Sequence, residues 1–165
     1  MKYNDIRRPA RAVHIGRVTV GGNAPIAIQS MTNTDPHDVA ATLSQIRALA
    51  AAGCDVVRLT VPDREAAETV RVIKESGVQI PIVADIHFDY RLALLCPEYG
   101  VDKIRINPGN IGGEDRVRAV ADACRARHIP IRIGVNSGSL EKHILEKYGA
   151  PTPEALCASA LYHAS

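Results

Sequence analysis

Charged and polar side chains recur at even spacing, two or four residues apart, in four apolar segments of the chain. The residues are Arg58 and Thr60, Asp85 and His87, Arg105 and Asn107, and Arg132 and Asn136. Positions i and i+2 of a β-strand point to the same face of its sheet, so each segment predicts one apolar face and one polar face. Guanidinium groups bind phosphate through paired hydrogen bonds. Arginines within three otherwise apolar strands therefore predict a site for an anionic ligand.

Asp85 and His87 are predicted to be the catalytic pair of this site. A carboxylate two positions from an imidazole can fix the tautomer of the ring and favour its charged form. His87 is then either a proton donor to a leaving oxygen or a cation that binds phosphate, and both roles stay open. The alternative for this stretch is a solvated strand end that begins a helix. The alternative for the arginines is structural ion pairing at the strand ends.

Apolar strands alternate with amphipathic helices and supply the elements that position these residues. Strands are expected over residues 26–32, 56–61, 80–88, 103–110 and 130–136, each followed by helical sequence. Asp35 and Asp63 are predicted as N-caps of the first two helices, and Pro97 is expected to break or kink the third. Alternation at this interval predicts right-handed βαβ crossovers and a parallel sheet.

The predicted fold class is α/β, with about five of the eight (βα) units of a TIM barrel. Active sites of such barrels lie at the C-terminal rim of the strands, where the polar residues above are found. A doubly wound open sheet that binds a nucleotide is the competing architecture. It is disfavoured because no Gly-x-Gly-x-x-Gly turn follows the first strand.

Two segments are predicted before and within this barrel. Residues 1–25 form an N-terminal arm and a β-hairpin, expected to act as a small plug or lid. Within that hairpin, His14 is predicted to be a surface strand residue. Residues 26–165 form a partial TIM-barrel substrate-binding domain, with the rest of the barrel expected to lie outside this sequence.

Composition limits the class of protein. The 165 residues are 46% hydrophobic and carry a net charge of +2, which predicts one substantial core and no nucleic-acid partner. No apolar run is long enough to span a bilayer and the first residues lack a secretory signal, so a cytoplasmic protein without a membrane partner is expected. The cysteines are far apart and are predicted to be buried packing residues, with no metal site in this chain; they are Cys54, Cys96, Cys124 and Cys157.

Four motifs resemble the 4-hydroxy-3-methylbut-2-enyl diphosphate synthase family. They are QSMTNT from Gln29, VADIHFDYR from Val83, RINPGNIG from Arg105 and RIGVNSGSLEK from Arg132. The resemblance implies an iron–sulfur oxidoreductase of the methylerythritol phosphate pathway of isoprenoid biosynthesis. Its reaction is the reductive ring opening and dehydration of 2-C-methyl-D-erythritol 2,4-cyclodiphosphate. Two other interpretations stay open: a non-catalytic phosphate-binding barrel fragment, or another barrel enzyme that acts on a phosphorylated or pterin-like substrate.

The resemblance also implies residue roles and partners. The diphosphate-binding positions fall on Arg58, His87, Arg105, Arg132 and Asn136, with Asp85 and Asn107 beside them. A [4Fe–4S] cluster held by three cysteines and a glutamate of a second domain is implied, with ferredoxin or flavodoxin as electron donor and a homodimer as the assembly. Those cluster ligands are expected to be absent from this chain, which alone is then inactive. Open sheet edges lead us to expect self-association.

Overall fold

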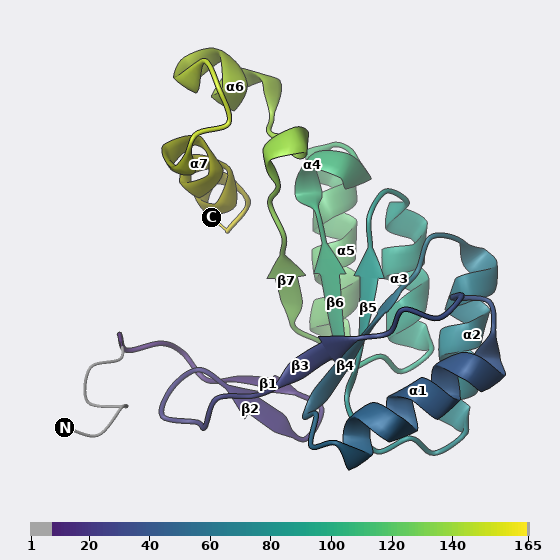
Figure 1. Cartoon of the computed structure of the whole chain (residues 1–165). Helices are drawn as coiled ribbons and strands as arrows, with labels where there is room; N and C mark the ends of the chain where they lie inside the picture. The colour runs from purple at the N-terminus through teal and green to yellow at the C-terminus, as the bar shows by residue number, and fades with distance from the viewer. Residues whose placement is uncertain (1–7, 165) are drawn as a thin grey trace.

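A curved parallel sheet carries the fold, and the computed structural model describes residues 8–164 of the chain (Figure 1). The first seven residues of the predicted N-terminal arm lie outside the described part. The sheet strands pair in chain order; they are β3 (Gln29–Met31), β4 (Val56–Thr60), β5 (Ile82–Ile86), β6 (Lys103–Ile106) and β7 (Ile131–Ile133). All four pairings are parallel, as the βα alternation predicts.

Helices follow each strand, so the five predicted βα units are confirmed. They are α1 (Val39–Ala51), α2 (Arg64–Glu75), α3 (Tyr90–Glu98), the single turn α4 (Pro108–Ile111) with α5 (Glu114–Ala126), and then α6 (Lys142–Tyr148) and α7 (Pro153–Ala164). A 3₁₀ turn at Ser137–Ser139 precedes α6. Five parallel strands with their helices on one side form the arrangement expected of successive βα units of a TIM barrel.

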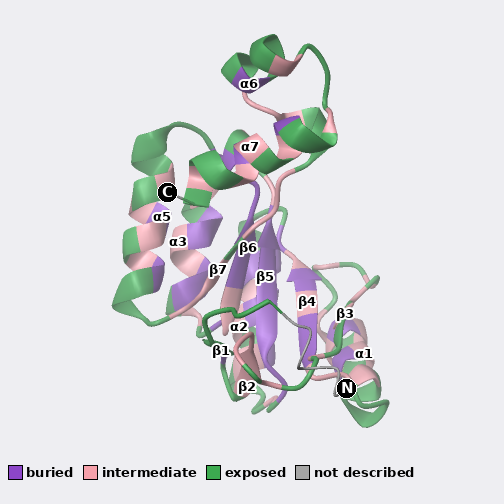
Figure 2. Ribbon diagram, turned by 90° about the vertical axis from the view of Figure 1, so that its left-hand side faces the viewer, coloured by how far each residue is buried: buried purple, intermediate pink, exposed green. Residues whose placement is uncertain are grey.

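The main core lies between the sheet and the helices on its convex side. Outward-facing strand residues such as Leu59, Ala84 and Ile106 pack there against Val70 of α2 and Val120 of α5. Figure 2 shows β4, β5 and β6 as the most buried strands. Each large aliphatic side chain buried in this layer stabilises the fold by roughly 1.5–3 kcal/mol. The apolar face predicted from strand parity is thus the face that the helices cover.

Helix ends follow the predicted capping chemistry in one case and depart from it in another. Asp63 caps α2 as expected, since its Oδ1 accepts a hydrogen bond from the Ala66 N–H at 2.9 Å. Asp35 does not cap α1. Asp38 does, with Oδ1 2.9 Å from the Ala41 nitrogen, because Asp35 is engaged by both the backbone and the ring of His37. Pro97 does not break α3, which continues to Glu98.

The predicted hairpin is present and closes one end of the sheet. Strands β1 (Val13–Ile15) and β2 (Val18–Val20) pair antiparallel, and Ile15 packs against Val56 and Val83 near the N-terminal ends of their strands. This position makes the hairpin a plug. Its turn needs glycine at Gly16, where φ is +54° and a Cβ would lie 2.7 Å from the Asp102 carboxylate. His14 is exposed, as predicted, and its Nδ1 lies 3.0 Å from the Thr19 hydroxyl.

A hydrogen bond across the concave face shows that the sheet is strongly curved. Lys103 Nζ on β6 lies 3.1 Å from Gln29 Oε1 on β3, although β4 and β5 separate the two strands. Three strand spacings in a flat sheet would amount to about 14 Å. The contact forms because the sheet curls, and the polar side chains consequently converge on the inside of the curve.

Candidate anion-binding site

Asp85 lies at the centre of the concave face and joins two of the predicted arginines. Its carboxylate is buried, with 2% of the residue exposed. Arg105 Nη1 donates a hydrogen bond to Asp85 Oδ1 at 3.0 Å, and Arg58 Nε lies 3.4 Å from Oδ2. The ion pairing that was the alternative reading of the arginines is therefore real for Arg58 and Arg105. It leaves each guanidinium with further N–H groups for a ligand.

Strand register explains why these side chains meet. Asp85 is the register partner of Arg105, and Arg105 is the partner of Arg132. Side chains at paired positions of parallel strands point to the same side of the sheet. Arg105 is 8% exposed beneath its neighbours, whereas Arg132 is exposed on β7. The structure thus brings together a buried and an accessible guanidinium, as strand parity predicts.

His87 stands at the rim of this cluster. Its Nε2 lies 4.0 Å from Asp85 Oδ1, and 40% of its side chain is exposed. The ring also lies beside the exposed Phe88, with 6.2 Å between ring centroids. The short contacts of Asp85 therefore go to arginines, and His87 is the more loosely held member of the predicted catalytic pair.

The two predicted asparagines differ in accessibility. Asn107 is 2% exposed and donates a hydrogen bond from Nδ2 to the Ser139 hydroxyl at 2.6 Å. Ser139 in turn donates to the Asn136 carbonyl at 3.2 Å. Asn107 therefore anchors the turn after β7, while the Asn136 side chain is exposed on that turn.

Gly134, Met31 and Lys103 complete the concave face and were not among the predicted site residues. A Cβ on Gly134 would overlap the guanidinium group of Arg105, and the Gly134 carbonyl accepts a hydrogen bond from Arg105 Nη2 at 3.4 Å. Met31 Sδ lies 3.2 Å from Arg58 Nη2. Lys103 shares the strand parity of Arg105, and that signal could have identified it.

Positive charge dominates this face. Among residues 8–164, four cations on this face, Arg58, Lys103, Arg105 and Arg132, lie near one carboxylate, that of Asp85. Burial lowers the pKa of Lys103 below its ordinary value, and the nearby charges of Arg132 and Arg58 lower it further. A half-buried ammonium group whose charge is disfavoured by neighbouring positive charges is stabilised by an anionic ligand.

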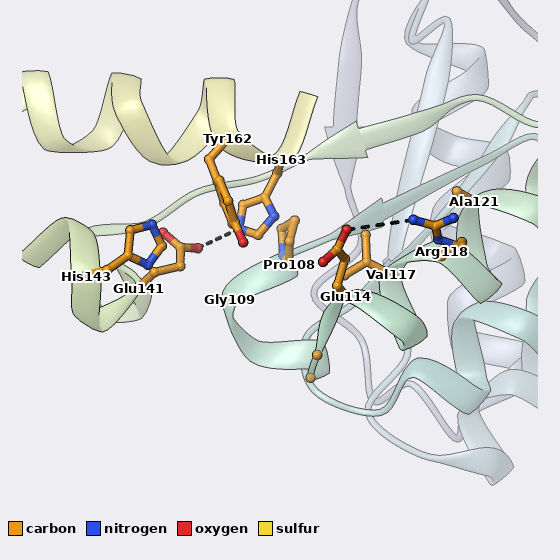
Figure 3. A pocket seen from close by; sticks show the side chains of 12 residues that line it. Pro108, Gly109, Glu114, Val117, Arg118, Ala121, Glu141, His143, Tyr162 and His163 are labelled. Carbon is orange, nitrogen blue, oxygen red and sulfur yellow. Dashed lines mark hydrogen bonds and ion pairs between the residues drawn. The ribbon is translucent and has the colours of Figure 1, made fainter. Parts of the chain in front are cut away.

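A separate hollow of about 590 Å³ lies between α5 and the α6–α7 pair (Figure 3). Its lining includes Glu114, Arg118, Glu141, Tyr162 and His163, and none of the predicted site residues. His163 Nε2 lies 2.5 Å from Glu141 Oε1 in this hollow. The predicted site lies apart from this hollow, on the open concave face of the sheet.

The cysteines lie on separate elements. Cys96 and Cys124 are buried as predicted, and burial raises the pKa of their thiols to about 12 and about 11. Cys54 is half-buried. Buried packing is wrong for Cys157, which lies on the exposed side of α7. Among the residues that the structure describes, no three His, Cys, Asp or Glu side chains are grouped to hold a metal ion.

Comparison with known proteins places these features in a family context. The GcpE TIM-barrel domain family matches residues 10–165. The chain is 66% identical over 157 residues to the 4-hydroxy-3-methylbut-2-en-1-yl diphosphate synthase (flavodoxin) of Azotobacter vinelandii. Identity is 64% over 158 residues for the protein of that name from Pseudomonas aeruginosa, and 65% over 157 residues for the one from Pseudomonas syringae pv. tomato. These alignments cover 95–96% of this chain and 42% of each relative.

Proposed function

Because the chain belongs to the GcpE TIM-barrel domain family, we propose that it supplies the substrate-binding barrel of a 4-hydroxy-3-methylbut-2-en-1-yl diphosphate synthase. The reaction is the reductive ring opening and dehydration of 2-C-methyl-D-erythritol 2,4-cyclodiphosphate. Relatives with this name are 64–66% identical to nearly the whole chain. The word flavodoxin in their names supports flavodoxin, rather than ferredoxin, as the electron donor of the complete enzyme.

The observation that carries this proposal is the cation cluster on the concave face. A cyclic diphosphate presents two negatively charged phosphoryl groups, and guanidinium forks from separate strands can hold both. Arg132 is exposed and free to turn towards such a ligand. Arg105 is fixed by Asp85 and by the Gly134 carbonyl, which prepares its position before binding.

The same cations can assist the chemical step. As a ring C–O bond breaks, negative charge develops on the departing phosphoryl oxygen, and fixed positive charges nearby stabilise that charge. His87 lies at the solvent side of the cluster, from where it can donate a proton to this oxygen or bind it as a cation. Asp85 serves to hold the arginines.

The redox group that the resemblance implies does not fit the described residues. The four cysteines are distributed over separate elements, and two of them are thiols buried in the core. The ligands of a [4Fe–4S] cluster would come from outside residues 8–164, and the cluster would supply the reducing electrons. A homodimeric assembly and a cytoplasmic location remain parts of this proposal. No helix within the described range is long and apolar enough to cross a membrane.

Calorimetric titration with the cyclodiphosphate tests the proposal. The Arg105→Ala, Arg132→Ala double variant should lose at least tenfold in affinity, because each charged hydrogen-bonding group typically contributes about 1.5–3 kcal/mol. The matched control is the Arg118→Ala, Arg125→Ala double variant, which removes the same charge from exposed positions on α5. Equal binding by both double variants and the wild-type chain would remove the arginines from the site.

A further inference from the structure

Lys103 lies on the concave face in the same register row as Arg58, nearer the N-terminal end of β6 than Arg105. It begins β6 two positions before Arg105, and its register partner Val83 packs against the hairpin residue Ile15. The aliphatic part of the half-buried Lys103 side chain therefore lies near these apolar residues, and its ammonium group reaches Gln29. A lysine in this setting normally has an acidic partner.

The partners of Lys103 do not neutralise its charge. Within residues 8–164 it donates one hydrogen bond, to the neutral amide of Gln29, and forms no ion pair with a carboxylate. The charged groups that act on it are Arg132 and Arg58, both positive. Asp85 already contacts two arginines. A repulsive arrangement of this kind is stabilised when an anion binds between the cations.

The number of charges indicates which anion. Counted over the described part of the chain, four cations and one carboxylate leave three uncompensated positive charges on the face, and without Lys103 two would remain. A single phosphoryl group carries about −1.5 to −2 at neutral pH. Orthophosphate is therefore matched by the arginines and Asp85 alone, whereas inorganic diphosphate carries more negative charge and gains from the additional cation. In the cyclic diphosphate each phosphoryl group is a diester with one negative charge, and Lys103 acts there by giving the second phosphoryl group a cation of its own.

We propose that Lys103 is a specificity-determining residue, whose ammonium group makes the site select ligands with two phosphoryl groups over ligands with one. This inference rests on the proposed function, because it assumes that the anion binds at the arginines. Gln29 holds the ammonium group of Lys103 through a hydrogen bond. The flexible aliphatic side chain of Lys103 lets the ammonium group turn towards a phosphoryl oxygen. The competing role of Lys103 is purely structural: its hydrogen bond to Gln29 would only brace the fold, by linking β6 to β3.

Titration of inorganic diphosphate and of orthophosphate into the 165-residue chain distinguishes the two roles. Lys103→Met keeps an unbranched stem of similar length and removes the charge, whereas Gln29→Met removes the same hydrogen bond and keeps the charge. We expect Lys103→Met to bind diphosphate about tenfold more weakly, with orthophosphate affinity changed much less. Gln29→Met should leave the ratio of the two affinities unchanged.

Other results would overturn the inference. Equal losses in Lys103→Met and Gln29→Met would show a brace, and equal losses for both anions in Lys103→Met would show a general charge effect. If Lys103→Met fails to fold, Lys103→Gln, which can still hydrogen-bond to Gln29, gives the same test. Wild-type chain that binds no diphosphate would overturn the proposed anion site itself, whereas wild-type binding matched by the lysine variants would overturn only the role of Lys103.

Discussion

The guanidinium group of Arg105 occupies the space into which a side chain on Gly134 would project. The carbonyl of Gly134 also accepts a hydrogen bond from Arg105 Nη2 at 3.4 Å, while Asp85 holds Nη1 from the opposite strand at 3.0 Å. The arginine is thus held between β5 and the segment after β7. Its orientation depends on a glycine that contributes no side chain.

Gly134→Ala is therefore expected to displace Arg105 and weaken diphosphate binding. The added methyl group must push the guanidinium from its bond with Asp85, and affinity should fall by about tenfold or more. Gly138→Ala is the matched control, because a Cβ there meets nothing within 4 Å. Calorimetry with inorganic diphosphate gives the comparison. Unchanged binding by Gly134→Ala would mean that Arg105 does not need this orientation.

Asp85→Asn should destabilise the chain in a manner that a ligand partly reverses. The substitution keeps the side-chain shape but leaves the buried Arg105 without its counter-charge, and loss of one partner of a buried pair costs about 3–5 kcal/mol of unfolding free energy. Diphosphate supplies negative charge to the same arginines and stabilises the folded state by binding it. Urea unfolding with and without diphosphate measures both effects. A variant as stable as the wild type would show that the pair is not needed for the fold.

His87→Gln tests the rim residue in a full-length enzyme that contains this barrel. A general acid typically contributes about 10²–10⁴-fold to the rate, so that role predicts a fall in kcat with little change in KM. A purely phosphate-binding role predicts a rise in KM instead. His14→Gln, on the plug hairpin, serves as the control because its ring contacts Thr19 at the surface. Unchanged kinetics would confine His87 to a structural role.

His37 predicts a pH dependence of stability. Its ring bridges Asp63 and Asp35 at 2.9 Å each, and these hydrogen bonds, the one to Asp63 foremost, raise the pKa of His37 above its ordinary value. A raised folded-state pKa means that this contribution is complete below about pH 6.5, the unfolded value, and is lost as the pH rises through the folded value. Thermal unfolding between about pH 6 and pH 8 should show the loss in the wild type. In His37→Asn the curve should be flatter; equally steep curves would assign the dependence to another group.

Strand parity was sufficient to predict the side chains that share the concave face. Arg58, Asp85 and Arg105 lie together because side chains at every second position of a strand point to one face, and because parallel pairing puts these faces on the same side of the sheet. The same rule applies to Lys103, but this residue begins β6 and so lies away from the C-terminal strand ends at which barrel active sites are expected. The family resemblance read from four motifs is confirmed by the domain match.

Contacts between elements could not be predicted from one segment at a time. The need for glycine at position 134 depends on where the Arg105 side chain of the neighbouring strand lies. Likewise, Asp38 caps α1 in place of Asp35, because the carboxylate of Asp35 accepts a hydrogen bond from the backbone N–H of His37. This contact depends on the conformation of the loop before the helix. The side-chain amide of Asn107 donates a hydrogen bond to Ser139, because the turn after β7 folds back over it. For Gly134 and Asn107 the partner comes from another element, and for Asp35 it comes from within the same loop.

The location of the bound substrate tests the central claim most directly. A crystal structure of the chain with 2-C-methyl-D-erythritol 2,4-cyclodiphosphate should place phosphoryl oxygens within hydrogen-bond distance, about 2.7–3.2 Å, of the guanidinium groups of Arg105 and Arg132. Asp85 should still contact Arg105 in that complex. A ligand found instead in the hollow lined by Glu114, Glu141 and His163, with the arginines unoccupied, would contradict the account.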